Sequence, residues 1–185
     1  MYFDKVFYDI EAIESRLAEL EYPLYFLDYE TYPAAIPVFD GCYPFQQVPF
    51  QYSLHVQKDS SAPIEHKEFL HIDDSNPIMN LTHQLRKDMG NIGSVIVWNK
   101  SFEGKCNSDM AEQVPELSDF LLGINTRFFD LEEVFKKQMY VDKGFLGRTS
   151  IKNVLPILVP NLTYKGSSYS KWRCCLQLME TNDFQ

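Results

Sequence analysis

The fold of this chain is decided by one stretch, Leu24-Tyr25-Phe26-Leu27-Asp28-Tyr29-Glu30-Thr31. Its first four residues are apolar or aromatic and prolines flank the segment, so the pattern predicts a buried strand over residues 24–31. Side chains alternate along a strand, and Asp28 and Glu30 are therefore expected on the same face, roughly 7 Å apart. The stretch thus places two carboxylates at the end of a strand that is buried in the fold.

The acid pair predicts a metal site. Two like charges at the end of a buried strand are unfavourable unless a cation lies between them. Carboxylate oxygens are the ligands that hard divalent ions such as Mg²⁺ and Mn²⁺ prefer, so Asp28 and Glu30 are predicted to bind such an ion. In the alternative, both side chains face solvent on a strand that ends there, and the pair is a chance feature of a structural α/β domain.

The composition indicates one globular domain. The 185 residues are 45% hydrophobic, which is enough for one packed core and too little for two large domains. No apolar run approaches the ~20 residues of a membrane-spanning helix. The N-terminus also lacks the basic start and apolar core of a signal peptide. We therefore expect a cytoplasmic protein without a membrane partner.

The cysteines and histidines show no spacing typical of a metal site. These residues are Cys42, Cys106, Cys174, Cys175, His55, His66, His71 and His83. The cysteines are predicted to be reduced thiols of an intracellular protein. The histidines are predicted to be sheet or surface residues.

The charge distribution argues against a protein that coats nucleic acid through backbone charge alone. The formal net charge is −9, and residues 1–92 carry all of it, with 6 Lys and Arg against 15 Asp and Glu. Residues 93–185 hold 11 of each kind. Basic residues of this second half are compatible with a local phosphate-contacting surface, among them Lys100, Lys105, Arg148 and Lys152.

Strand and helix patterns alternate along the chain. Strands are predicted over residues 24–31, 50–56, 65–72, 94–99 and 128–131. Helices are predicted over residues 9–20, 77–89, 102–114, 116–124 and 149–155. Asp9 is the expected N-cap of the first helix, and the second and third strands are expected to form a hairpin. Residues 32–49, with four prolines and Gly41, are expected to form an irregular packed loop.

This order of elements resembles the ribonuclease-H-like fold of the DEDD (DnaQ-like) exonuclease superfamily. It is more closely similar to an uncharacterised bacterial domain family assigned to that superfamily. The stretches that carry the resemblance are Tyr25–Thr31, Pro49–His55, Val97–Glu103, Phe129–Leu131 and Ser150–Pro156. The resemblance covers roughly residues 22–165. It implies an α/β fold with a mixed sheet of about five strands, an antiparallel hairpin plus parallel strands, flanked by helices. Residues 1–21 would form a helix packed on or leading into a domain over residues 22–185.

The resemblance also implies an activity and its metal ligands. Such enzymes are metal-dependent 3′–5′ exonucleases, which hydrolyse phosphodiester bonds at single-stranded DNA or RNA ends with four carboxylates and two Mg²⁺ or Mn²⁺ ions. Asp28 and Glu30 match the first two carboxylates. Glu103 matches the third, where the superfamily carries Asp, and all three would be catalytic metal ligands. In the alternative, Glu103 is a helix N-terminal carboxylate favoured by the macrodipole.

Further site residues follow from the same resemblance. The expected substrate-binding residues are Thr31, Asn99, Lys100 and Phe102. Asp130 is expected to support the site, or alternatively to cap the helix that follows it. Tyr29, between the two acids, is expected to belong to the core rather than to the catalytic site.

The chain departs from the superfamily in lacking the motif that carries the fourth carboxylate. The segment after Tyr164 contains neither Tyr-x-x-x-Asp nor His-x-x-x-x-Asp, although Glu180 and Asp183 lie near its end. The expectation is therefore a fragment, or a truncated chain with impaired catalysis. The alternative function is a nuclease-fold module that binds nucleic acid or a protein partner without cleaving.

Overall fold

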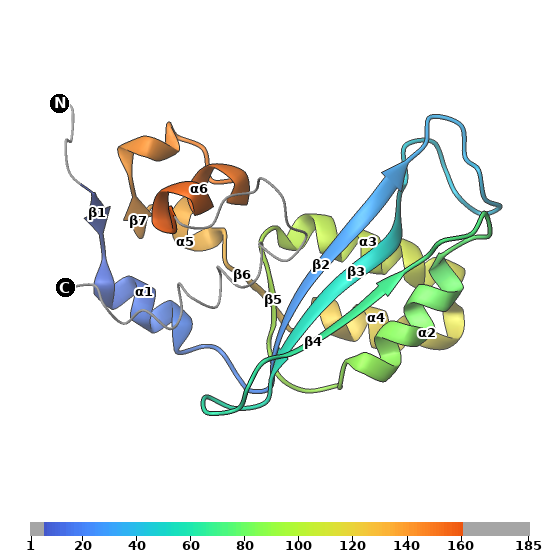
Figure 1. Cartoon of the computed structure of the whole chain (residues 1–185), viewed down its shortest axis with the longest axis horizontal. Coiled ribbons are helices and arrows are strands. Elements are labelled where there is room, and N and C mark those ends of the chain that lie inside the picture. The colour runs from blue at the N-terminus through green and yellow to red at the C-terminus, as the bar shows by residue number, and fades with distance from the viewer. Residues whose placement is uncertain (1–5, 161–185) are drawn as a thin grey trace. The chain divides into compact units, whose positions relative to one another are not determined.

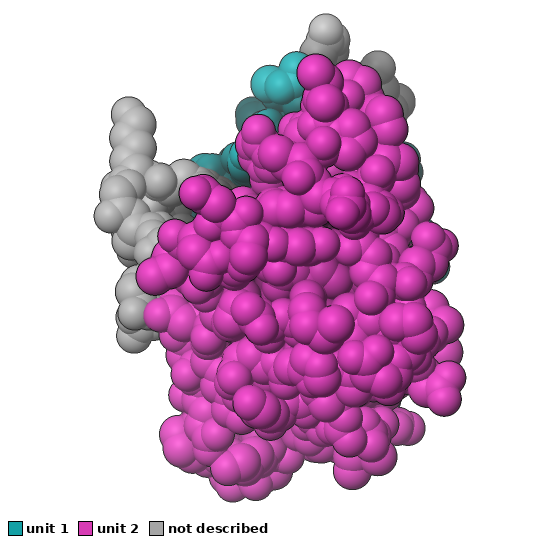
Figure 2. Space-filling model, turned by 90° about the vertical axis from the view of Figure 1, so that its right-hand side faces the viewer, with its two compact units in different colours: residues 1–19, 131–185 teal, residues 20–130 magenta. Residues whose placement is uncertain are grey.

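The chain divides into two compact units, residues 1–19 with 131–185 (unit 1) and residues 20–130 (unit 2), which Figure 2 colours teal and magenta. The structure is a computed structural model that describes residues 6–160. The expected division into a helix over residues 1–21 and a domain over residues 22–185 stays a prediction.

Unit 2 is built on a five-stranded mixed sheet (Figure 1). Its strands are β2 (Leu24–Pro33), β3 (Gln47–Gln57), β4 (Glu65–Leu70), β5 (Val95–Val97) and β6 (Phe128–Asp130). They lie in the order β4-β3-β2-β5-β6; β2, β3 and β4 pair antiparallel, whereas β5 pairs parallel with both β2 and β6. The predicted α/β class, with a mixed sheet of about five strands flanked by helices, is confirmed.

Three helices pack with alternate strand residues to form the core of unit 2. They are α2 (Ile78–Asp88), α3 (Lys100–Gln113) and α4 (Ser118–Asn125), which follows a 3₁₀ turn at Pro115–Leu117. The core contains Tyr25, Leu27 and Tyr29 of β2, Tyr52, Leu54 and Val56 of β3, and apolar residues of all three helices. Because a strand has period two, the residues between these core positions face the other side of the sheet.

The start of β5 depends on a glycine and an arginine. Gly93 has φ +89°, and a Cβ atom there would lie 2.1 Å from the Pro23 carbonyl oxygen, so a larger residue does not fit. The Arg127 guanidinium donates to the carbonyl oxygens of Gly90, Ile92 and Gly93 at 2.8–3.2 Å. These contacts fix the turn that leads from α2 into the central parallel strand.

Unit 1 contains short elements from both parts of the chain. They are β1 (Phe7–Tyr8), α1 (Ile10–Leu17), α5 (Glu133–Lys136), β7 (Tyr140–Val141), a 3₁₀ turn at Lys143–Phe145 and α6 (Ile151–Leu158). The predicted N-cap is confirmed, because Asp9 Oδ1 accepts a hydrogen bond from the Ala12 N–H at 3.0 Å. The antiparallel pairing of β1 with β7 was not predicted. Two-residue strands carry too little pattern to be found from sequence.

Two further expectations concern the cysteines and the membrane. Cys42 and Cys106 carry free thiols, as predicted, and burial raises the pKa of Cys106 to about 12. Cys174 and Cys175 lie outside the described residues. Within residues 6–160, none of the helices has the length and apolar character that crossing a bilayer requires.

Candidate functional site

The expected site residues of unit 2 gather at one edge of the sheet. In the parallel register Phe26 lies opposite Ile96, and Val97 lies opposite Asp130, so β2, β5 and β6 end on the same side (Figure 1). Asp28 and Glu30 lie at this carboxyl edge on β2, and Asn99 lies there where β5 passes into α3. Open α/β sheets commonly bind ligands at this edge, because loops and helix N-termini leave a crevice there.

Asp28 and Glu30 share a face of β2, as the sequence predicts. Their partners on β3 are Ser53 and Gln51, and the register shifts only after Glu30. Asp28 is half-buried and Glu30 is exposed. The two carboxylates therefore lie at the rim of the sheet, where solvent and a ligand can reach Glu30.

Tyr29 points to the helix-covered face and is 3% exposed. Its hydroxyl donates to Asn107 Oδ1 on α3 at 2.8 Å. Burial raises the pKa of Tyr29, and the neighbouring Cys106 and Glu103 raise it further. The expectation that Tyr29 belongs to the core is confirmed.

Glu103 lies in the first turn of α3 and is 4% exposed. It precedes the core residue Cys106 by one turn, and its charge contributes to the raised pKa of Tyr29. A carboxylate in the first turn is favoured by the helix macrodipole. The position of Glu103 thus agrees with the alternative reading, while a metal-binding role stays a prediction.

Asp130 supports the start of α3. It is 3% exposed, and its Oδ2 accepts a hydrogen bond from the Lys100 N–H at 3.3 Å. The alternative in which Asp130 caps the helix that follows it is wrong, because the N-cap of α5 is Glu132. A carboxylate that ends one parallel strand instead satisfies the first N–H of the helix that follows its neighbour.

The four expected substrate-binding residues take different positions. Thr31 donates through Oγ1 to Gln47 Oε1 at 2.6 Å, and Asn99 caps α3 by accepting from the Ser101 N–H at 3.2 Å. Phe102 packs against the core of unit 2, whereas Lys100 is exposed. Their contact with a substrate stays a prediction, and Asn99 and Lys100 are the exposed residues among them.

The donor set at this edge fits a hard divalent ion. Asp28 and Glu30 offer carboxylate oxygens on one face, which are ligands for Mg²⁺ and Mn²⁺. Over residues 6–160, no three His, Cys, Asp or Glu side chains converge closely enough to hold a metal ion. Glu180 and Asp183 lie outside the described residues. The site therefore consists of a pair of carboxylates.

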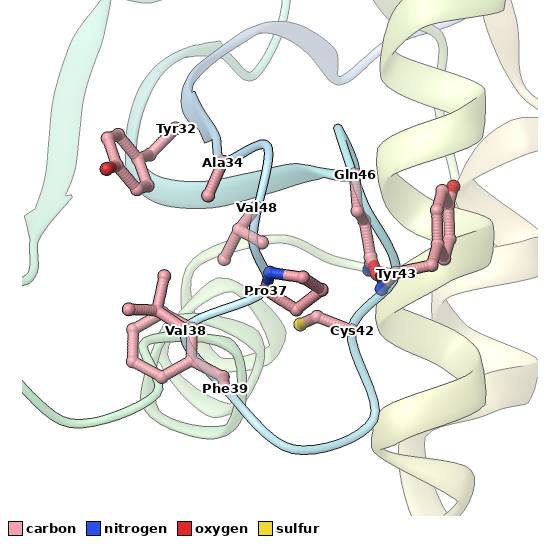
Figure 3. A pocket seen from close by; sticks show the side chains of 9 residues that line it. All are labelled: Tyr32, Ala34, Pro37, Val38, Phe39, Cys42, Tyr43, Gln46 and Val48. Atoms are coloured by element: carbon pink, nitrogen blue, oxygen red, sulfur yellow. Dashed lines mark hydrogen bonds between the residues drawn. The ribbon is translucent and has the colours of Figure 1, made fainter.

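The loop between β2 and β3 forms a second feature, which the sequence showed only as an aromatic-rich segment. It encloses a small pocket (Figure 3), which is lined by Tyr32, Ala34, Pro37, Val38, Phe39, Cys42, Tyr43, Gln46 and Val48. The loop is tied to α3, because the Tyr43 hydroxyl donates to Asp109 Oδ2 at 2.9 Å and Gln113 Nε2 donates to Cys42 Sγ at 3.4 Å. Its outer side exposes Ile36 (83%) and Phe45 (69%).

The sequence matches the family described as "Domain of unknown function (DUF2779)" over residues 25–150. It is also 31% identical over 158 residues to Uncharacterized protein UU173 of Ureaplasma parvum serovar 3. That alignment covers 80% of this chain and 23% of the relative, so the chain spans about a quarter of the curated relative's length. No solved structure matches the sequence.

These matches correct the expected family. Assignment to the DEDD (DnaQ-like) exonuclease superfamily is wrong, since the family that matches is DUF2779 and neither match names an exonuclease. The motifs that suggested it are short, and an acid-x-acid pair at the end of a strand can occur by chance. The positions of Asp28, Glu30 and Glu103 in the fold do not depend on that assignment.

Proposed function

We propose that this chain, which belongs to the DUF2779 family, is a divalent-cation-dependent hydrolase of phosphodiester bonds at DNA or RNA ends. One observation carries the proposal: the carboxylates of Asp28 and Glu30 share one face at the carboxyl edge of the parallel strands.

Two carboxylates suffice for the ion that we propose. Mg²⁺ keeps several of its waters and is usually held by one or two carboxylates together with substrate phosphates. A site with Asp28 and Glu30 alone would thus bind the ion weakly until the substrate adds its own oxygens. Mn²⁺ takes the same kind of ligand and is the more convenient probe.

The start of α3 offers a contact for the phosphate of the substrate. This helix has 14 residues and begins at the same edge; Asp130 and Asn99 already bind its first N–H groups, so we expect the side chain of Lys100 to make the contact. Lys100, its first residue, is exposed and adds a formal positive charge. The first half of the chain is acidic overall, and for that reason we expect contact with one or two phosphates rather than with a long strand.

The reaction follows from these parts. A bound ion of this kind activates a water molecule and stabilises the leaving oxygen of a phosphodiester. Asp28 and Glu30 would hold the ion, and Lys100 would hold the phosphate.

Calorimetric titration with Mn²⁺ tests the ion site. We expect binding to the parent chain, and loss of that binding in Asp28→Ala and Asp28→Asn, because each removes a charged oxygen ligand. The matched control is Glu68→Gln, which removes an exposed carboxylate from β4 in the same sheet. Equal binding by the parent and Asp28→Asn would reject the site.

An assay with single-stranded oligonucleotides tests the activity. DNA and RNA oligonucleotides labelled at the 5′ or the 3′ end would be digested by the parent with Mn²⁺. Addition of EDTA or the Asp28→Asn change should abolish digestion. The label that is released first gives the direction of cleavage. Digestion that proceeds equally in Asp28→Asn would show a contaminating nuclease and would refute the proposal.

A second candidate function is a module that binds nucleic acid or a protein without cleaving. The observation that favours it is the loop of residues 34–46, which α3 holds in place while Ile36 and Phe45 stay exposed. Metal binding without digestion of any oligonucleotide would favour this module over the hydrolase.

We also propose a cytoplasmic location. The free thiols of Cys42 and Cys106 are compatible with a reducing compartment, and nucleic-acid ends are present there. Fractionation of cells that express the tagged chain would test this.

A further inference from the structure

Two histidines lie side by side on the adjacent strands β3 and β4 of unit 2. His55 on β3 lies opposite His66 on β4, and their rings stack with centroids 4.4 Å apart and an interplanar angle of 29°. Strand alternation puts His55 on the face of Ser53 and Asp28, opposite to the core residues Leu54 and Val56. The pair thus lies on the side of the sheet that the core helices do not cover.

The ring nitrogens of His55 and His66 differ in their hydrogen bonding. The Nδ1 atom of His55 is buried and has no hydrogen-bond partner among the described residues. The Nε2 atom of His66 lies 3.1 Å from Ser53 Oγ. Burial of His55, together with the neighbouring His66, lowers the pKa of His55 to about 4. At neutral pH His55 is therefore uncharged, which is the form that binds a metal ion.

We propose that His55 and His66 form a binding site for a borderline transition-metal ion such as Ni²⁺, Zn²⁺ or Cu²⁺, separate from the carboxylate pair. Imidazole nitrogen suits these ions, whereas carboxylates suit Mg²⁺ and Mn²⁺. Two nitrogens bound at about 2.1 Å to one ion lie roughly 3 Å apart. The ring centroids are 4.4 Å apart, and the proposed site requires rotation of the side chains to bring one nitrogen of each ring to that spacing.

The site has two protein ligands, and water completes the coordination. No third His, Cys, Asp or Glu within residues 6–160 lies close enough to join them. The ion would connect β3 to β4 in the folded state only, because the unfolded chain does not hold the two rings together. Binding should therefore stabilise the fold in proportion to the ion concentration.

The probe is NiCl₂ in excess Mg²⁺, added to the full chain. Excess Mg²⁺ would compete with Ni²⁺ for the carboxylates of Asp28 and Glu30, and the difference between the parent and the histidine variants reports on the histidines. We expect Ni²⁺ binding to the parent, and at least tenfold weaker binding in His55→Gln and in His66→Gln. His83→Gln is the matched control, since His83 is exposed on α2 beside Glu116, and it should bind as the parent does.

Thermal unfolding gives an independent readout. Ni²⁺ should raise the unfolding midpoint of the parent and of His83→Gln, and should leave that of His55→Gln and His66→Gln unchanged. Far-UV circular dichroism of each variant checks that it folds, and the exposed His66 is the safer of the two positions to change. Absence of Ni²⁺ binding to the parent, or binding in His55→Gln and His66→Gln that is as tight as in the parent, would overturn the proposal. Neither result depends on whether the chain hydrolyses phosphodiesters.

Discussion

The two faces of the unit 2 sheet differ in what their side chains do, although they alternate along the same strands. The helix-covered face carries Tyr25, Leu27, Tyr29, Tyr52, Leu54 and Val56, all almost fully buried. The opposite face, which we call the polar face, carries Asp28, Glu30, Ser53, His55, His66 and Glu68. The first face packs against the core helices, and the second, which also buries Phe26 and Ile96, supplies the carboxylate and imidazole ligands that we propose.

Polar groups on the helix-covered face serve the packing. The Tyr29 hydroxyl donates to Asn107, and the Tyr52 hydroxyl donates to Asp88 Oδ2 at 2.6 Å. On the polar face, by contrast, His55 keeps an unpartnered ring nitrogen among the described residues. The polar groups of the helix-covered face are therefore held by hydrogen bonds within the core, whereas the polar face has a ring nitrogen that can bind a ligand.

The largest expected effect is a difference in the free energy of unfolding between substitutions at two neighbouring residues of β3, one on each face of the sheet. Leu54 is fully buried, and Leu54→Ala should lower the free energy of unfolding by about 2–5 kcal/mol, because it removes packed methyl groups and leaves a cavity. Ser53→Ala, on the polar face, should change it by less than about 1 kcal/mol. Urea denaturation measures the free energy of unfolding of both variants. Equal losses would show that the two faces of the sheet do not differ in their contribution to stability.

A smaller effect is expected from a buried hydroxyl. Tyr29→Phe removes the donor to Asn107 Oδ1 and should lower the free energy of unfolding by about 1–3 kcal/mol, because a buried acceptor loses its partner. The matched control is Tyr43→Phe, whose hydroxyl donates to Asp109 at a more exposed site where Lys105 also binds that carboxylate. Chemical denaturation should show the smaller loss for Tyr43→Phe, and a larger loss there would contradict the prediction.

The smallest expected effect is a pH dependence on the polar face. The pKa of His55 is about 4 in the folded state against 6.5 in the unfolded state, so the unfolded chain binds the proton more readily. Stability from His55 is thus present above pH 6.5 and is lost as the pH falls towards 4.

We expect a loss on the order of 1 kcal/mol across this range, since solvent around the pair weakens the effect. The groups near His55 on the polar face are His66 and Ser53, with Asp28 and Glu68 beyond. His55→Gln should reduce the pH dependence of the urea midpoint between pH 7 and pH 5. An unchanged dependence would place the responsible group elsewhere.

Much of the fold could be predicted, because it rests on local periodicity. Period two and a continuous apolar run identified all five strands of unit 2, and helical spacing identified α1, α2 and α3. Asp28 and Glu30 were placed on one face for the same reason. The family could not be predicted in this way, since short motifs at a carboxyl edge recur in unrelated proteins.

Contacts between side chains far apart in the sequence could not be predicted from it. His55 and His66 are eleven positions apart, without metal-site spacing, and the sequence predicts only that they are sheet or surface residues. Only the register of β3 against β4 brings their rings together. Asp130 was likewise expected to support the site or cap the next helix, and the tertiary structure places its carboxylate on the N–H of Lys100.

The five strands of unit 2, the longer helices, the face of each strand residue and the acid pair follow from the sequence alone, because they rest on periodicities of two and 3.6 residues; the two-residue strands β1 and β7 do not. The tertiary structure decided which side chains meet: Tyr29 with Asn107, Asp130 with the start of α3, and His55 with His66. Contacts such as Tyr29–Asn107 join elements far apart in the chain, and packing of the whole core decides which of these elements become neighbours; the register within a hairpin such as β3–β4 depends on its hydrophobic pattern and turn.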